Sequence, residues 1–397
     1  MAIKICVIGQ GYVGLPLALS FSEKGYEVVG LDNNLDKVKS INLGHSFIED
    51  IKSERLSNAL TSGNFIATSE YKVLKDVDVI IICVPTPLGQ NQKPDLSHLI
   101  YSIKSVSEYI SKGSLLIVES TVAPGTIKNN VVSLLESELK IDIDDIDIAY
   151  SPERVDPLNQ NWNLKNTPKI VAGLTEGARI RAKNLYSTIV DNVIEANSLE
   201  AAETAKLLEN SFRLVNISLI NEISTFCRES GIDVTEVVRL AATKPYGFMS
   251  FNPGLGAGGH CIPVDPLYLA DKSQEFGIPQ NLIKSASEIN RNMPKYFMKL
   301  AESQLEKLEG KRILVIGVSY KPNIADVRET PVESLILGLK EKGSKVFWHD
   351  ELVKDWNGEQ STPLSDNFDL VILATAHDYL DLKLVGDAPI LNVRGSI

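Results

Sequence analysis

Cysteine is scarce in this chain of 397 residues, which contains only Cys6, Cys83, Cys227 and Cys261. No pair has the Cys-x-x-Cys spacing and all four are far apart, so neither a zinc site nor a disulfide framework is expected. We expect no metal site. Three of the four lie inside apolar runs and are predicted to be core residues; Cys261 does not.

The chain also lacks an excess of positive charge and any long hydrophobic run. Its formal net charge is −11 and its pI is near 5.1, which argues against a nucleic-acid or anionic-membrane partner. No apolar run reaches membrane-spanning length, and the first residues enter a strand pattern without the features of a signal peptide. We therefore expect a cytoplasmic protein with no membrane partner.

The length predicts two or three domains, and a 44% hydrophobic content is ample for their cores. The run 4–8 has strand character, and a Gly-x-Gly-x-x-Gly turn leads from it into an apolar helix. This context is typical of a dinucleotide-binding turn, formed by Gly9, Gly11, Tyr12, Val13 and Gly14.

A second strand, 26–31, ends on Asp32, where an acidic residue bonds the adenosine ribose in such folds. An anion there repels a 2′-phosphate, so NAD is favoured over NADP. Lys37 follows in the next helix and is a further candidate for cofactor contact. The alternative is a βαβ unit without a ligand.

Strand and helix patterns alternate to about residue 197. In an open parallel sheet the ligand lies beyond the carboxyl ends of the strands, so polar turns there are candidates for contact. The alternatives are ordinary turn chemistry and, for Glu153, a solvated loop acid. The candidates in these turns are Val84, Pro85, Thr86, Ser120, Thr121, Glu153 and Arg154.

Residues 199–229 contain no helix breaker, and apolar residues recur at helical spacing. One helix of this length spans about 45 Å, enough for a spine between domains or a dimer contact. Lys206 and Asn210 are four apart and share a face. They form an ordinary solvated pair unless that face turns toward Cys261.

Cys261 follows the glycine-rich stretch 254–259, and Asp265 stands four residues further on. Glycines let the backbone approach a ligand closely, and a helix is expected to begin near Pro266, which would lower the pKa of the thiol. The alternative is a surface loop with a buried cysteine. From about residue 306 a second α/β pattern begins, and its long loop 320–331 carries Lys321 and Arg328.

Five segments, 9–18, 84–87, 120–126, 258–265 and 317–329, resemble in order and spacing the UDP-glucose/UDP-N-acetylhexosamine dehydrogenase family over essentially the whole chain. Residues 151–155 and 244–248 look more like the branch that oxidises UDP-N-acetylglucosamine or UDP-N-acetylmannosamine. The resemblance implies two successive NAD-dependent oxidations at C6 of the sugar, from alcohol to carboxylate.

The resemblance also implies roles. Cys261 matches the nucleophile that forms a thiohemiacetal and then a thioester, a step that suits a thiolate. Lys206 and Asn210 match the oxyanion-stabilising pair, Asp265 and Thr121 the residues that hold water, and Glu153 a carboxylate of thioester hydrolysis. Arg328 matches a residue that contacts the cofactor in this family. The substrate contacts implied are Glu153, Arg154, Lys206, Asn210, Phe251, Gly254, Gly256, Gly258 and Lys321.

Two positions depart from the family pattern. The UDP-glucose branch often has a second glutamate four residues after the first, and here that position is Pro157. The chain also ends soon after Arg394, which affects any uridine contact expected beyond it.

We therefore expect three α/β parts: an NAD-binding Rossmann domain (1–197), a central long-helix domain with the cysteine loop (198–305) and a Rossmann-like UDP-sugar domain (306–397), with the active site in the cleft between them. We expect a homodimer or higher homo-oligomer through the central helix. The expected substrate is UDP-N-acetylglucosamine, then its manno and galacto epimers, with the product used for surface polysaccharide. The alternatives are a UDP-glucose 6-dehydrogenase and a catalytically silent nucleotide-sugar-binding protein.

Overall fold

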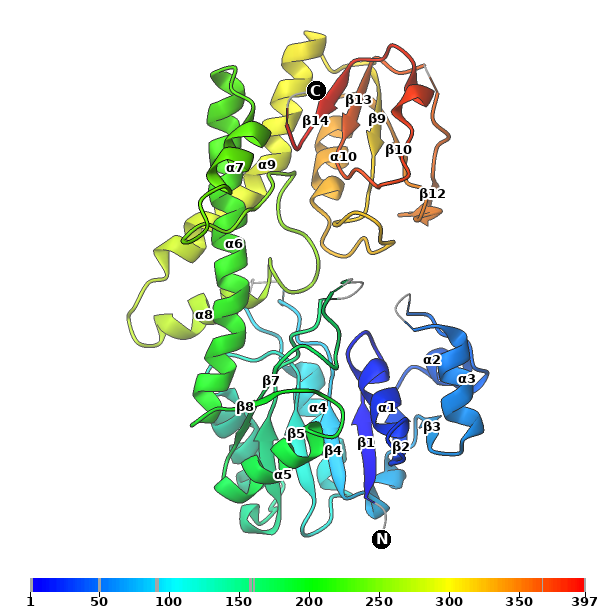
Figure 1. Ribbon diagram of the computed structural model, residues 1–397, viewed down its shortest axis with the longest axis vertical. Helices are drawn as coiled ribbons and strands as arrows, with labels where there is room; N and C mark the ends of the chain where they lie inside the picture. Colours follow the sequence, from blue (N-terminus) through cyan, green and yellow to red (C-terminus); the bar gives the residue numbers. More distant parts are fainter. Residues whose placement is uncertain are drawn as a thin grey trace. The chain divides into compact units, whose positions relative to one another are not determined.

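The structure is a computed structural model that describes residues 3–48, 51–89, 93–156, 159, 161–365 and 367–395. The chain forms two compact units, Met1–Leu208 and Glu209–Ile397 (Figure 1). Each unit has its own sheet. The three-part division at residues 197 and 305 stays a prediction.

The first unit is built on an eight-stranded sheet with the order β3-β2-β1-β4-β5-β6-β7-β8. All neighbouring strands are parallel except β6 and β7, which are antiparallel. The strands are β1 (Lys4–Ile8), β2 (Glu27–Leu31), β3 (Phe65–Thr68), β4 (Val79–Ile82), β5 (Leu115–Val118), β6 (Asp147–Tyr150), β7 (Lys169–Gly173) and β8 (Val193–Glu195). The order reverses between β1 and β4, which is the position where such sheets bind ligands.

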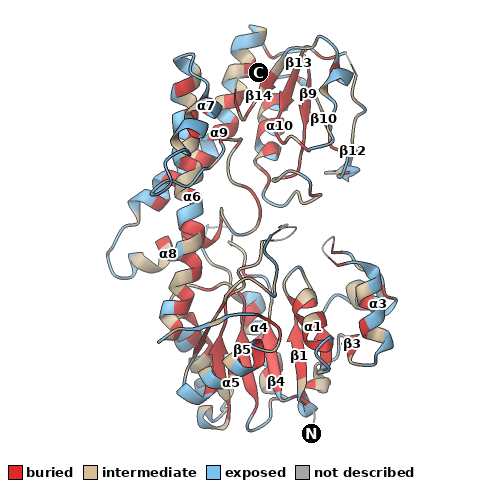
Figure 2. Cartoon of the chain, in the orientation of Figure 1, coloured by how far each residue is buried: buried red, intermediate tan, exposed pale blue. Residues whose placement is uncertain are grey.

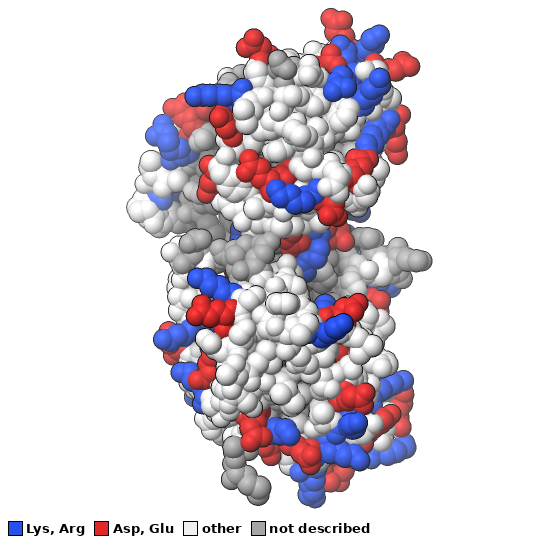
Figure 3. Space-filling model, turned by 90° about the vertical axis from the view of Figure 1, so that its right-hand side faces the viewer, with Lys and Arg blue, Asp and Glu red and all other residues white. Residues whose placement is uncertain are grey.

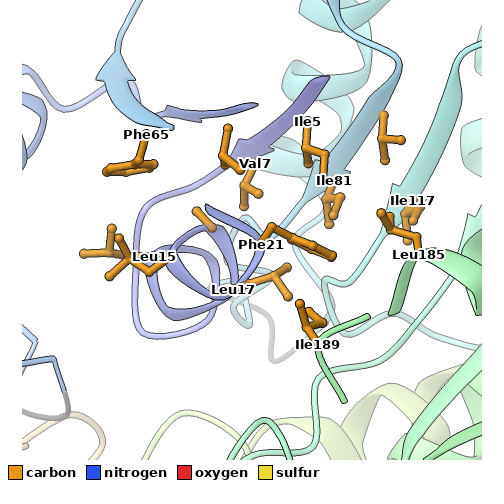
Figure 4. Packing of buried hydrophobic residues seen from close by; sticks show 14 of the residues in the cluster. Ile5, Val7, Leu15, Leu17, Phe21, Phe65, Ile81, Ile117, Leu185 and Ile189 are labelled. Carbon is orange, nitrogen blue, oxygen red and sulfur yellow. The ribbon is translucent and has the colours of Figure 1, made fainter. Parts of the chain in front are cut away.

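Both faces of this sheet are covered. In β1, Ile5 and Val7 join one hydrophobic cluster and Cys6 and Ile8 the other, because alternate residues point to opposite faces. Figure 2 shows the resulting buried strands, and Figure 4 shows the first cluster, where Phe21 lies among residues from the sheet and from two helices. The apolar runs of the sequence thus predict a doubly covered parallel sheet correctly.

Helices connect these strands. They are α1 (Gly14–Ser22), α2 (Leu35–Asn42), α3 (Ser53–Thr61), α4 (Ser97–Ser107) and α5 (Glu176–Tyr186), with the shorter helical segments η1 (Tyr71–Asp76), η2 (Ile127–Val132), η3 (Leu134–Glu138) and η4 (Ile143–Asp145). The first unit ends inside α6 (Leu199–Glu229), whose 31 residues agree with the predicted helix.

Among the described residues, the second unit contains the rest of α6, four further α-helices and a four-stranded parallel sheet with the order β10-β9-β13-β14. Side chains of α9 and α10 cover one face of this sheet, with Phe297 and Leu335 in the cluster. The elements are α7 (Val234–Ala241), α8 (Asp265–Gln274), α9 (Asn281–Leu305), β9 (Arg312–Ile316), α10 (Pro331–Glu341), β10 (Lys345–His349), β11 (Asp355–Trp356), β12 (Glu359–Gln360), β13 (Leu370–Leu373), η5 (Leu382–Val385) and β14 (Ile390–Asn392).

Charged side chains of both signs are interspersed on the face in Figure 3, as expected of a chain whose negative net charge is spread out. Among the described residues, no helix is both long and apolar enough to cross a membrane.

Candidate active site

The turn after β1 uses its three glycines for three different reasons. Gly9 has φ +92°, and a Cβ on it would stand 2.7 Å from the carbonyl oxygen of Cys83. A Cβ on Gly14 would stand 1.9 Å from the carbonyl oxygen of Gly9, so this glycine allows α1 to pack against the turn. A Cβ on Gly11 would meet no atom within 4 Å, which leaves an open approach at the beginning of α1. Backbone N–H groups at such a helix start suit a phosphate.

Asp32 lies at the carboxyl end of β2 and is buried. Its Oδ2 accepts a hydrogen bond from the N–H of Gln10 at 2.8 Å, which ties it to the glycine turn. The Nζ of Lys37 is 3.8 Å from the same oxygen. Asp32 and Lys37, both predicted to contact the cofactor, are thus together beside the turn, whereas Tyr12 and Val13 lie at its helix end.

The turns after β4 and β5 are joined to each other. Thr86 Oγ1 donates to the carbonyl oxygen of Thr121 at 2.7 Å, and Ser120 Oγ donates to that of Val84 at 2.6 Å. The hydroxyl groups of Thr86 and Ser120 therefore hold the backbone of this edge in place. The structure brings these predicted contacts together, along with Pro85, at the carboxyl ends of adjacent strands.

Glu153 is not a solvated acid. Its Oε1 accepts N–H groups of Arg154 (2.7 Å) and Val155 (2.6 Å), and its Oε2 lies 3.2 Å from the Nζ of Lys169. Burial raises the pKa of Glu153, but Lys169, the two N–H groups and Lys206 outweigh it, so the pKa lies below its usual range. The guanidinium of Arg154 donates a hydrogen bond to the carbonyl oxygen of Pro168 at 2.7 Å. Pro157 lies outside the described residues.

Lys206 and Asn210 are both buried on α6, so the solvated-pair alternative is wrong. Within the second unit, Asn210 Nδ2 donates to Asp265 Oδ2 at 2.6 Å. Asp265 is the first residue of α8, and its N–H donates to the carbonyl oxygen of Cys261 at 2.8 Å. Asn210, Asp265 and the backbone of Cys261 are thus one connected group.

Cys261 is exposed, whereas Cys6 and Cys227 are buried and Cys83 is partly buried. The buried-cysteine alternative for residue 261 is therefore wrong, and the thiol stands four residues before α8 begins. The glycines before it allow tight packing: a Cβ on Gly258 would stand 2.6 Å from the Cβ of Tyr320, and one on Gly256 would stand 2.9 Å from the carbonyl oxygen of Asn290. Gly254, like Gly11, has no atom within 4 Å of a built Cβ.

Two buried asparagines that the sequence analysis missed hold this loop. Asn221 Oδ1 accepts the N–H of Gly254 at 2.8 Å, and Asn290 Oδ1 accepts that of Ala257 at 3.1 Å. Asn221 Nδ2 also donates to Asn290 Oδ1 at 3.0 Å. An asparagine inside an otherwise regular helix is the only signal that the sequence offers for such a role.

The remaining predicted residues lie elsewhere in the second unit. The ring of Phe251 packs edge to face against that of Phe212, with centroids 6.1 Å apart. Arg328 makes three side-chain hydrogen bonds to the two carboxylate oxygens of Asp326 in its own loop, the shortest at 2.5 Å. The carbonyl oxygen of Lys321 accepts a hydrogen bond from Ser319 Oγ at 3.0 Å. The cofactor role of Arg328 and the substrate role of Lys321 stay predictions.

The described residues contain no group of three or more His, Cys, Asp or Glu side chains arranged to hold a metal ion. The glycine turn at the start of α1 and the buried acid after β2 do fit a dinucleotide, since they offer an open, N–H-rich approach beside a carboxylate.

The strand order and this turn define a Rossmann-type dinucleotide-binding protein. Sequence comparison identifies it further. The chain matches the NAD binding domain (residues 3–190), central domain (200–292) and UDP binding domain (314–394) of the UDP-glucose/GDP-mannose dehydrogenase family. It belongs to this family and is an NAD-dependent dehydrogenase.

Two relatives and one solved structure illustrate the match. The chain is 36% identical to the UDP-N-acetyl-D-mannosamine dehydrogenase of Pyrococcus horikoshii, over 94% of this chain and 89% of that protein. It is 34% identical to the UDP-N-acetyl-D-glucosamine 6-dehydrogenase of Pseudomonas aeruginosa, over 94% and 90%. A solved structure of UDP-D-ManNAc dehydrogenase from P. horikoshii covers 99% of this chain and 95% of its own, with 33% identity and a TM-score of 0.91.

Proposed function

We propose that this protein oxidises C6 of a UDP-N-acetylhexosamine from a primary alcohol to a carboxylate, with Cys261 as the nucleophile. The observation that carries the proposal is the exposed thiol of Cys261 at the end of a glycine loop, joined through its backbone to the buried Asp265–Asn210 pair. A protein that only binds the nucleotide sugar has no use for an exposed nucleophile beside such a pair.

The chemistry follows from these groups. Oxidation of the alcohol gives an aldehyde, and the thiolate of Cys261 adds to its carbon to give a thiohemiacetal. A second oxidation gives a thioester, and water releases the acid and restores the thiolate. The glycine turn and Asp32 would hold NAD, and two NAD molecules bound in succession would each accept one hydride, one for each oxidation. The covalent link prevents loss of the aldehyde between them.

The other predicted residues have complementary roles in this proposal. Lys206 and Asn210 donate to the oxygen on C6 as negative charge develops on it. Asp265 and Thr121 hold the water, and Glu153, ionised because of its low pKa, removes a proton from it.

The first substrate to test is UDP-N-acetylglucosamine, followed by its manno and galacto epimers. Relatives at 36% and 34% identity are named for the manno and gluco sugars, so both belong in the panel. UDP-glucose is included because its oxidation at a higher rate would replace the N-acetylhexosamine assignment. Use of the product for surface polysaccharide is the expectation that accompanies this substrate class.

The decisive experiment incubates the protein with NAD and each UDP-sugar and counts NADH per acid formed. Two NADH per acid are expected, and one would contradict the scheme. Cys261→Ala is expected to bind the UDP-sugar with unchanged affinity and to form no acid. Normal acid formation by that variant would exclude the covalent route.

We also propose that the protein is a homodimer formed through α6. In the part of this helix that belongs to the second unit, four large apolar side chains are 37% to 61% exposed, at positions that recur along one stripe: Phe212, Leu219, Ile223 and Phe226. Beside them, α6 and α9 border an open groove of about 910 Å³ that includes Phe226, Ile289 and Met293. A second copy of the same stripe would cover this apolar surface.

A further inference from the structure

Two carboxylates share one buried lysine in the first unit. Lys169 Nζ lies 3.1 Å from Glu119 Oε1 and 3.2 Å from Glu153 Oε2. Lys169 and Glu119 are 4% and 2% exposed, respectively. A charged group this well buried requires a partner, and here one ammonium serves two acids.

The topology explains how these three residues meet. Glu119 follows β5 and Glu153 follows β6, so both stand at the carboxyl edge of the sheet. Lys169 is the first residue of β7, which runs antiparallel to β6 and therefore begins at that same edge. The strand patterns in the sequence did not reveal this reversal.

Other groups complete the surroundings of Glu119. Tyr186 of α5 donates its hydroxyl to Glu119 Oε1, and its ring centroid is 4.9 Å from Lys169 Nζ. The thiol of Cys83, the residue after β4, is close enough to Glu119 and Lys169 for their charges to affect its pKa. Glu119 Oε2 is buried and has no hydrogen-bond partner among the residues that the structure describes, so it retains an unused acceptor.

The two acids differ in how readily they take a proton. Burial raises the pKa of Glu119 to about 7, even though Lys169 lowers it. The pKa of Glu153 lies below its usual range, because Lys169, two N–H groups and Lys206 outweigh the effect of its own burial. A pair whose environments separate the two pKa values in this way suits acid–base chemistry near neutrality.

We propose that Lys169 and Glu119 are positioning residues for Glu153: Lys169 orients the Glu153 carboxylate, and Glu119 stores the proton that Glu153 takes from water during thioester hydrolysis. This inference rests on the proposed function. It supplies the second carboxylate that the sequence lacks at Pro157, from β5 instead of from the loop after β6.

The step balances as follows. Water adds to the thioester carbon, the carbon–sulfur bond breaks and the sulfur leaves as the Cys261 thiolate. One proton of the water goes to Glu153; the other is released when the product acid ionises. Lys169 then passes one of its protons to Glu119 and receives the proton on Glu153, so the ammonium is restored and no redox partner is needed.

The first part of the test measures the covalent adduct on Cys261 by intact-protein mass spectrometry during turnover. Glu153→Gln is expected to accumulate the thioester and to slow acid release by about 10²-fold. If Glu153→Gln releases acid at the wild-type rate, the proposed role of Glu153 is wrong. If Glu153→Gln accumulates thioester but Glu119→Gln does not, the role of Glu153 stands and only the proposed role of Glu119 is wrong.

The second part is the pH profile of acid release in a single turnover. In the wild type, release is expected to rise with pH through about 7, because protonated Glu119 cannot accept another proton. Glu119→Gln is expected to remain slow across pH 6–8 without this rise. If the pH profile of Glu119→Gln matches that of the wild type, the inference is overturned. Tyr186→Phe is the companion variant: it keeps both acids and the lysine but removes the hydroxyl that donates to Glu119, so the rise in release should persist and move to higher pH.

Lys169→Met tests the link between the acids and should accumulate thioester as Glu153→Gln does. Removing a buried lysine from two carboxylates can prevent folding. The first hydride transfer, measured on the same sample, reports whether the site has formed. If Lys169→Met does not fold, Glu119→Gln and the wild-type profile decide the question, and a wild-type profile that is flat from pH 6 to 8 contradicts the proposal.

Discussion

Asn210 on α6 donates a 2.6 Å hydrogen bond to Asp265, the first residue of α8, and both side chains are buried. The N–H of Asp265 in turn bonds to the carbonyl oxygen of Cys261 at 2.8 Å. A residue of the long helix therefore fixes the turn that presents the thiol. This relationship explains why Asn210 and the cysteine loop belong to one functional group although 51 positions separate Asn210 from Cys261 (261 − 210).

Asn210→Ala is expected to lower kcat by about 10²-fold to 10³-fold, because it removes a donor to the C6 oxygen and leaves buried Asp265 without this partner. Steady-state kinetics with the preferred UDP-sugar measure the effect. Asn216→Ala is the control, since Asn216 lies on the same helix and bonds only to the carbonyl oxygen of Phe212 at 2.7 Å in the described hydrogen bonds. Equal activity of the two variants would contradict the role of Asn210.

The glycine turn offers a prediction that separates stability from binding. Gly14→Ala is expected to destabilise the protein by about 3 kcal/mol or more, because its Cβ would stand 1.9 Å from the carbonyl oxygen of Gly9. Gly11→Ala should fold normally, since no atom lies within 4 Å of its Cβ. It should bind NAD about 10-fold more weakly, because the added methyl group would stand where the phosphates must approach the backbone.

Urea unfolding without ligand and NAD titration of both variants measure these effects. A normal NAD affinity for Gly11→Ala would show that the open side of the turn does not face the cofactor. Wild-type stability of Gly14→Ala would show that α1 can shift at little cost.

Local patterns predicted much of this protein. The strand, glycine turn and helix at residues 4–22 and the helix at 199–229 are recognisable because their signals lie within single segments. The exposure of Cys261 also agrees with its glycine-rich approach.

The missed features depend on partners that are distant in the sequence. The bond between Asn221 and Asn290 joins residues 69 positions apart, and the shared lysine of Glu119 and Glu153 depends on the direction of β7. Neither residue type nor spacing encodes these contacts, because a buried amide or charge is defined by the elements that fold around it.

Glu203 on α6 predicts a specific pH dependence of stability. Its carboxylate accepts the N–H groups of Gly125 (2.5 Å) and Ile127 (2.9 Å), at the start of η2. Burial raises its pKa from 4.5 to about 7 in spite of these bonds. The folded state thus holds the proton more tightly than the unfolded state, so ionisation between pH 4.5 and 7 lowers the free energy of unfolding.

Glu203→Gln removes this titration. The free energy of unfolding of the wild type, relative to that of the variant, should therefore fall by up to about 3 kcal/mol from pH 5 to pH 8. Urea unfolding at both pH values measures it. Glu200→Gln is a control of opposite sign, because Lys128 at 2.8 Å helps to lower the pKa of Glu200. A pH-independent difference for Glu203→Gln would refute the assignment.

The apolar stripe of α6 gives a prediction about assembly. Phe226→Glu is expected to convert a homodimer into monomers, because two copies of the stripe would bring buried carboxylates together without a cation. Phe226 is 61% exposed, so the substitution should leave the fold of a single chain intact. Light scattering coupled to size-exclusion chromatography measures the mass, and circular dichroism measures the helix content.

Leu384→Glu is the matched control, since Leu384 is 58% exposed in the same unit but lies in η5, away from the stripe. It should keep the wild-type mass. A monomeric wild type would contradict the homodimer directly, and a dimeric Phe226→Glu would move the interface away from α6.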